Sequence, residues 1–165
     1  MKLCYRKLFV PLIALFLPAA VLASPSGTLI IAENLSPENL DPANSQNSTV
    51  DQLMLGMYDT LVQFSAGETT VSPRLASDWS ASADGLTHTF NLRKGVTFHD
   101  GSALTADDVV WSMNRHIAEG SPSSIGAFFT LVKEWKAVDK HTVKLTLSSP
   151  DADMPFKLTQ PQAKI

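Results

Sequence analysis

The stretch SPRLASDWSASADGLTHTFNLRKGVTFHDGSALTADDVVWSMNR, residues 72–115, decides the fold. It contains, in order, Pro-Arg-Leu-Ala and a tryptophan, a Ser/Asp/Gly turn, an alternating strand, a Lys-Gly turn, Phe-His-Asp-Gly and the start of a capped helix. Each short motif alone is common in proteins. The ordered set is specific, because chance rarely produces these six signals in this succession.

Residues 86–93 alternate between apolar and polar side chains and predict a half-buried strand. The turn at Lys94-Gly95 predicts a hairpin between this strand and residues 96–98, and Asp100-Gly101 predicts a second turn. The predicted inward face consists of Leu86, His88, Phe90 and Leu92.

A helix is predicted to begin after Thr105, with Asp108 at its third position, and to end at Gly120. The adjacent carboxylates Asp107 and Asp108 fit the first turn of this helix, where negative charge meets the helix dipole. We therefore interpret the pair as part of a helix cap and not as an acid/base site. The predicted buried stripe consists of Val109 or Val110, Met113 and Ile117.

The remaining elements follow from shorter patterns. Residues 28–32 predict a buried first strand, followed by a loop over residues 33–47. Thr49 opens a helix, Gln63 to Ser72 reads as a polar loop, and residues 133–138 and 142–147 predict a second hairpin. The expected inward residues of the helix are Leu53, Met57 and Leu61, with Met54 beside them, and those of the hairpin are Val143, Leu145 and Leu147.

Residues 1–23 have the features of a secretory signal peptide, with a basic start, an apolar run over residues 8–17 and small residues at its end. We expect cleavage after Ala23. A membrane anchor is the alternative, but the apolar run is about half of the roughly 20 residues that span a bilayer. The only cysteine, Cys4, lies in the basic start, so the mature chain is not expected to be a lipoprotein.

Charge and cysteine content exclude several classes of protein. Removal of Lys2, Arg6 and Lys7 leaves ten basic residues against sixteen acidic ones, a net charge of −6. This balance argues against nucleic acid or anionic lipid as a partner. A mature chain without cysteine suits an oxidising compartment and excludes thiol chemistry.

No motif for catalysis, metal or cofactor binding is recognised. The four histidines are scattered and lack metal-ligand spacing, and no nucleophile elbow, phosphate loop or zinc-protease motif is present. We interpret His99 as a turn histidine that bonds nearby backbone or Asp100. Trp79 and Trp135 are expected to fill core space, while Trp111 is compatible with either packing or ligand contact.

Beyond residues 72–115, Leu40-Asp41-Pro42-Ala43, residues 57–62 and residues 138–147 complete an ordered set of motifs. Together these resemble the family 5 extracellular solute-binding proteins, the peptide and nickel receptors of bacterial ABC importers. The resemblance covers the chain after residue 27. It implies an α/β fold with α+β elements, of the type II periplasmic-binding-protein kind, in which residues 24–165 form part of the N-terminal lobe only.

The resemblance implies a periplasmic, non-enzymatic receptor that captures oligopeptides or dipeptides and delivers them to the permease subunits of an ABC importer. Nickel, heme, glutathione and sugar are the alternative ligands. Family members are far longer, so we interpret the chain as an N-terminal fragment whose full-length form is a monomer. The competing hypotheses are a truncated relic without binding activity and, least favoured, a secreted hydrolase.

The resemblance also implies where ligand is bound. The loop after the LDP element borders the cleft between two lobes, which makes Gln46, Asn47 and Ser48 candidate ligand-binding residues. A plain solvated loop explains them nearly as well. The segment from Ser121 is a weaker candidate, represented by Ser124 and Phe128.

Overall fold

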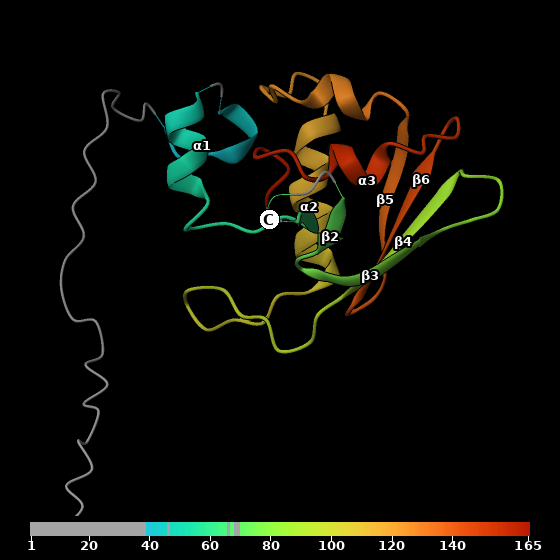
Figure 1. Ribbon diagram of the computed structural model, residues 1–165, viewed down its shortest axis with the longest axis horizontal. Coiled ribbons are helices and arrows are strands. Elements are labelled where there is room, and N and C mark those ends of the chain that lie inside the picture. The colour runs from blue at the N-terminus through green and yellow to red at the C-terminus, as the bar shows by residue number, and fades with distance from the viewer. Residues whose placement is uncertain (1–38, 46, 66, 68–69) are drawn as a thin grey trace, which may run out of the picture. The chain divides into compact units, whose positions relative to one another are not determined.

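The computed structural model describes residues 39–165 except residues 46, 66, 68 and 69. The predicted signal peptide and the predicted strand over residues 28–32 lie outside the described residues. The elements are η1 (Pro42–Asn44), α1 (Ser48–Met54), β1 (Val62–Phe64), β2 (Val71–Pro73), β3 (Ala76–Ala81), β4 (Thr87–Leu92), α2 (Ala106–Ile117), η2 (Gly126–Phe129), β5 (Val132–Asp139), β6 (Thr142–Leu147) and α3 (Met154–Lys157) (Figure 1).

An antiparallel sheet in the order β3-β4-β6-β5 forms the body of the described chain. Its central strand β4 buries alternate residues, as the sequence pattern predicts. Phe90 is fully buried and lies 6.3 Å from Trp135 of β5, centroid to centroid. The inward side chains of β6 are Val143, Leu145 and Leu147, which confirms the second predicted hairpin.

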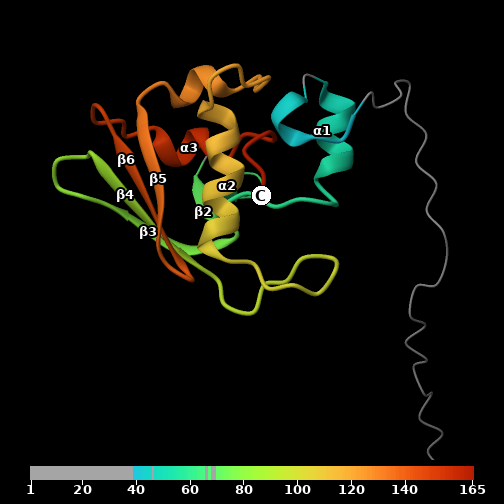
Figure 2. The ribbon, with the colours of Figure 1, turned by 180° about the vertical axis from the view of Figure 1, so that it is seen from behind.

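The helix α2 packs against β5 and β6 (Figure 2). Its N-terminus is capped as predicted, because the carboxylate of Asp108 accepts hydrogen bonds from the Thr105 amide at 2.8 Å and the Thr105 hydroxyl at 2.7 Å. Val109 and Met113 are buried, which confirms the predicted stripe in this part of the helix. His116 extends that stripe, and the helix ends at Ile117, before Gly120.

The predicted pairing of residues 96–98 with β4 is wrong. The neighbours of β4 are β3 and β6, so both of its edges are already occupied. Gly95 does form a turn with positive φ, but the chain then pairs locally with residues 102–104 around Gly101. The second predicted turn is therefore confirmed, and the hairpin partner of β4 is β3.

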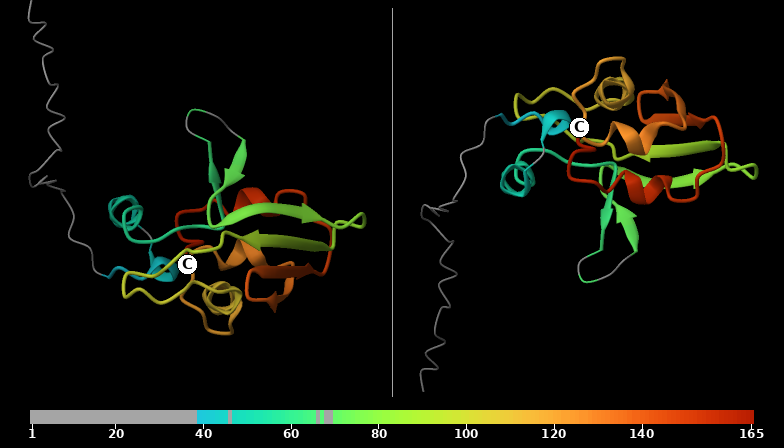
Figure 3. Two further views of the ribbon diagram at one scale, coloured as in Figure 1. Left: turned by 90° about the horizontal axis from the view of Figure 1, so that it is seen from below. Right: turned by 90° about the horizontal axis from the view of Figure 1, so that it is seen from above.

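The predicted polar loop from Gln63 to Ser72 is also wrong. Its two ends are β1 and β2, which pair antiparallel and project away from the four-stranded sheet (Figure 3). Phe64 of β1 forms an edge-to-face contact with Phe156 of α3 at 5.3 Å. The contact is made across 92 positions of sequence, so local periodicity gives no sign of it.

The N-cap of α1 lies two residues before the predicted Thr49, and the helix has a different buried face. Asn47 is the N-cap, and its side chain accepts a hydrogen bond from the amide of Thr49 at 2.8 Å. The expected face is wrong, because Leu53 and Met57 are exposed while Val50 and Met54 are buried. The third expected residue, Leu61, is buried but lies beyond the end of the helix.

Candidate functional site

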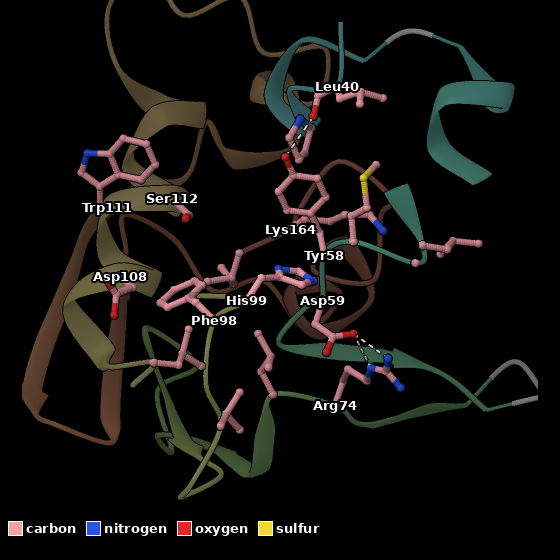
Figure 4. A pocket seen from close by; sticks show the side chains of 18 of the residues that line it. Leu40, Tyr58, Asp59, Arg74, Phe98, His99, Asp108, Trp111, Ser112 and Lys164 are labelled. Atoms are coloured by element: carbon pink, nitrogen blue, oxygen red, sulfur yellow. Dashed lines mark hydrogen bonds and ion pairs between the residues drawn. The ribbon is translucent and has the colours of Figure 1, made fainter. Parts of the chain in front are cut away.

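A cavity of about 860 Å³ lies among several segments that are distant in sequence (Figure 4). Its walls come from the segment before α1, the segment after α1, the turn after β4, the outer face of α2 and the last two residues. A volume of this order is typical of small-molecule sites. The polar and aromatic residues that line it are Asp41, Tyr58, Asp59, Arg74, Thr97, Phe98, His99, Asp108, Trp111, Ser112, Arg115 and Lys164.

The α2 wall presents Trp111, Ser112 and Arg115. These residues lie on the helix away from the buried stripe, and Trp111 is 66% exposed. The guanidinium of Arg115 lies over the indole ring, 5.3 Å from its centroid. An indole that faces solvent at a cavity wall offers a large flat surface for a ligand. Of the two alternatives for Trp111, packing in the core of the described residues is therefore excluded.

Arg115 also forms an ion pair with Asp41, which ties the α2 wall to the segment before α1. The hydrogen bond from Arg115 lowers the pKa of Asp41, and the Ala43 amide acts in the same direction. Both side chains are about one-third exposed, so water screens the pair. The charges of Arg115 and Asp41 nevertheless compensate each other at the rim of the cavity.

A second ion pair lies on another wall. Arg74 contacts Asp59 through two nitrogen atoms, at 2.7 Å and 2.6 Å. The neighbouring Tyr58 donates its hydroxyl to the carbonyl of Leu40 at 3.1 Å. These contacts connect the residues after α1 both to β2 and to the segment before α1.

The last two residues complete the cavity. The amide of Ile165 donates to the carbonyl of Asp59 at 2.8 Å, and Lys164 pairs with Thr60 in an antiparallel bridge. Lys164 is only 4% exposed. Burial lowers its pKa, while the fields of Asp59 and Asp51 oppose that effect.

His99 is exposed and lies at the cavity beside Phe98. The predicted bond from its ring to nearby backbone or Asp100 is wrong, because the Asp100 carboxylate accepts instead from the amide and hydroxyl of Ser102. The turn itself is therefore held without the histidine ring, which remains accessible from the cavity.

The structure does not bring the predicted ligand-binding residues to this cavity. Gln46 lies outside the described residues, and Asn47 caps α1. Ser48 is exposed on the first turn of that helix, and Phe128 is 43% exposed on η2. Ser124 is exposed and donates its hydroxyl to the carbonyl of Ser45 at 2.8 Å, so the two predicted segments contact each other. Ligand contact by these five residues stays a prediction.

A signal for the cavity was present in the sequence. Three motifs that carry the resemblance in the first subsection converge on it: Leu40-Asp41-Pro42, Met57-Tyr58-Asp59 and Phe98-His99. The sequence also indicates the outer face of α2, since Trp111 is not one of the residues of the predicted apolar stripe. Arg74 belongs to the Pro-Arg-Leu-Ala motif, residues 73–76, which reaches the cavity as well. Lys164 had no recognisable signal, because only the tertiary fold places it here.

The described part of the chain contains no cluster of three or more His, Cys, Asp or Glu side chains that could hold a metal ion. None of the helices found in that part is long and apolar enough to span a bilayer.

Residues 70–165 match the family of bacterial extracellular solute-binding proteins, family 5 (middle region). The chain belongs to this family. The dipeptide-binding protein of Escherichia coli (strain K12) is 37% identical to it over 164 residues, covering 88% of this chain. The heme-binding protein A of Haemophilus influenzae is 34% identical over 152 residues, covering 79% of this chain.

The solved structures agree with the family assignment. The periplasmic binding protein DppA from Helicobacter pylori, in complex with the peptide STSA, superposes with a TM-score of 0.67 at 31% identity, over 76% of this chain and 28% of that one. The fold is thus a mixed α/β fold of the periplasmic-binding-protein kind, as predicted. The chain spans about 30% of the length of the dipeptide-binding protein and 27% of the heme-binding protein, which corresponds to part of one lobe.

Proposed function

We propose that the whole protein, as its gene encodes it, is the periplasmic substrate-binding component of an ABC importer and captures short peptides. The observation that carries this proposal is the family membership together with the names of the relatives. Several of these, from two genera, are named for dipeptides or for di- and tripeptides. Binding proteins of this kind capture a solute between lobes that close on it, and the closed form then docks on the permease.

In this proposal the cavity contributes one side of the solute-binding cleft. Its wall combines a solvent-facing indole, Trp111, with charges held in place by the ion pairs of Arg115 and Arg74. Such a surface suits a peptide, which presents both apolar side chains and charged termini. The protein acts by binding alone, without catalysis or a cofactor.

Heme is the second candidate ligand, because one relative at 34% identity is named for heme. A nickel complex is a further alternative within the same class, since a structure at 28% identity holds nickel with histidine. Neither alternative changes the proposed role of solute capture.

Native mass spectrometry of the whole protein, purified without denaturation, tests the proposal by identifying the co-purified solute. Calorimetric titration with di- and tripeptides should then give saturable binding, with heme and nickel–histidine as the comparison ligands. Saturable binding of heme alone would replace the peptide proposal, and absence of binding to all three would remove solute capture.

The periplasmic location rests on the predicted signal peptide. Amino-terminal sequencing of protein released from the periplasm should begin at Ser24. Intact Met1 in the membrane fraction would contradict both the cleavage after Ala23 and the proposal that the mature protein is not a lipoprotein.

The predicted contacts of Gln46, Asn47, Ser48, Ser124 and Phe128 remain part of the proposal. Asn47 and Ser124 also have structural roles, so their substitution changes stability as well as binding. Ser48→Ala and Phe128→Ala are therefore the informative variants, because both side chains are exposed. Unchanged peptide affinity in both would exclude these two contacts.

A further inference from the structure

Lys164 is the one cation of the described cavity lining that no carboxylate pairs with. Lys164 is 4% exposed, yet no ion pair or side-chain hydrogen bond joins its ammonium group to another described residue. The buried side-chain atoms without a hydrogen-bond partner in that part of the chain are ring nitrogens of His88 and His141. The ammonium of Lys164 is not among them, so it retains access to the cavity it lines.

The other charges of the cavity are already compensated or engaged. Arg74 pairs with Asp59, and Arg115 pairs with Asp41. Asp108 accepts two hydrogen bonds from Thr105 in the helix cap. Within the described residues, Lys164 is therefore left as a cation without a partner, and a partly desolvated charge of this kind is costly unless a counter-charge meets it.

The nearby acidic residues favour the charged form of Lys164 without pairing with it, although burial is the larger influence and lowers its pKa. Asp51 accepts hydrogen bonds from Ser45 at 2.7 Å and from Gln162 at 3.0 Å. Its field and that of Asp59 oppose the lowering of the Lys164 pKa by burial. These fields favour the ammonium form, and no carboxylate of the described residues occupies the position of a direct partner.

We propose that Lys164 binds a carboxylate of the captured solute. The inference rests on the proposed function in that the solute is a short peptide, whose C-terminal carboxylate supplies the charge. One ammonium balances one negative charge, so a carboxylate fits better than a phosphate dianion, which the neighbouring Asp51 and Asp59 would repel.

The test compares the whole wild-type protein with Lys164→Met, which keeps an unbranched side chain one atom shorter and removes the charge. Lys144→Met is the matched control, because Lys144 is exposed on β6 and does not line the cavity. The probes are dialanine and dialanine amide in calorimetric titration, and acetate against chloride at equal ionic strength in thermal unfolding.

We expect the wild type and Lys144→Met to bind dialanine, which has a free carboxylate, more tightly than dialanine amide. The ratio of the two affinities should be about tenfold to a hundredfold, which corresponds to the usual free energy of a hydrogen bond to a charged group. Lys164→Met should lose that preference. Acetate should raise the Tm of the wild type and the control relative to chloride, and not the Tm of Lys164→Met, since only a bound ligand shifts the folding equilibrium. The Tm of Lys164→Met without ligand should be equal to or above that of the wild type, because an unpaired buried charge is removed.

An acid preference that survives in Lys164→Met, or an equal affinity of the wild type for acid and amide, would overturn the inference. A second outcome would also overturn the inference. In it, Lys164→Met has a lower Tm than the wild type, but keeps both the preference for dialanine over its amide and the rise in Tm with acetate. That outcome would assign Lys164 a structural partner. An acetate response that depends on Lys164, in a protein that binds no peptide, supports the carboxylate site and rejects the peptide part of the proposed function.

Discussion

The sheet and α2, within residues 76–147, differ from the segment around α1, residues 40–58, in what holds each in place. The sheet packs on α2 through one apolar cluster that includes Phe90, Met113 and Leu145. In the segment around α1, Ala43, Val50 and Met54 are buried but do not belong to that cluster. Polar contacts tie this segment to the rest of the described chain: Asp41 to Arg115, Ala43 and Ser45 to Ser124, and Asp51 to Gln162.

The difference matters for binding, because the cavity lies where the two regions meet. The outer face of α2 supplies a wall fixed by apolar packing, whereas the residues before and after α1 supply walls fixed by hydrogen bonds and ion pairs. Polar contacts of this kind contribute less to stability than core packing. We therefore expect substitutions in the sheet to affect folding most, and substitutions around α1 to affect it least.

The largest expected effect is that of Phe90→Ala in the sheet. The side chain is fully buried and contacts Trp135, so its truncation leaves a cavity and should lower the free energy of unfolding by about 3–5 kcal/mol. Chemical denaturation of the whole protein measures the change. Leu53→Ala is the control from α1, where the side chain is 40% exposed, and should cost about 0.5 kcal/mol or less. Equal losses in the two variants would remove the contrast between the regions.

A smaller effect is expected from His88→Leu in β4. His88 is 3% exposed, and neither ring nitrogen has a hydrogen-bond partner. Burial lowers its pKa, and the field of Asp151, the partner of Lys157, acts in the opposite direction. The unfolded state therefore binds a proton at a higher pH than the folded state, and stability falls as pH decreases below the ordinary His value of 6.5 towards the lower folded pKa.

His88→Leu should abolish this loss and stabilise the protein by roughly 1–3 kcal/mol, the usual cost of an unsatisfied buried polar group. The measurement is the free energy of unfolding at pH 7.5 and at pH 5, with exposed His99→Leu as the control. A variant that loses as much stability on acidification as the wild type would show that His88 is not the group that titrates.

Much of the sheet and of α2 was predictable because their signals are local. Alternation over residues 86–93 identifies a strand with one buried face, and Thr105 with Asp108 identifies a helix start within four residues. The pairing partner of β4 was not predictable in this way. The turn at Gly95 suggested a hairpin to the following residues, but β3 and β6 occupy both edges of the strand.

The segment around α1 was predicted less well for a physical reason. A spacing of four residues placed Leu53 and Met57 on the apolar face. The segment is instead joined to distant parts of the chain by hydrogen bonds, such as those from Gln162 to Asp51 and from Ser124 to Ser45, which local spacing does not reveal. The candidate site was also only partly predictable from local sequence patterns. Its motifs were visible in the sequence, but their convergence on one cavity, with Lys164 at its lining, is a property of the tertiary structure.

The capped helix gives the next prediction. Thr105→Ala removes the hydroxyl that donates to Asp108 and should cost about 1 kcal/mol, with little change in ligand affinity. The control Asp107→Asn removes an exposed charge from the same turn and should cost about half as much or less. Thermal unfolding and peptide titration of both variants provide the comparison. Loss of binding with an unchanged Tm, in either Asp107→Asn or Asp108→Asn, would contradict our interpretation of the acidic pair as a cap.

The smallest effect on stability is expected at the contact between the two regions, in Asp41→Asn. The asparagine still accepts a hydrogen bond from the Ala43 amide but no longer forms an ion pair with Arg115. Because both side chains are about one-third exposed, the loss of unfolding free energy should be about 0.2–1 kcal/mol at pH 7.

The pKa of Asp41 is lowered from its ordinary value of 3.8, so the ion pair stabilises the wild type above that pH. This stabilisation is lost as the pH falls through the lower pKa of the folded state. The difference between wild type and variant should therefore be smaller at pH 2 than at pH 7, because a protonated carboxyl is neutral like the amide. A difference that is the same at pH 7 and pH 2 would show that the asparagine disturbs packing. In that case, the stability of the segment around α1 would depend on side-chain packing as much as the stability of the sheet does.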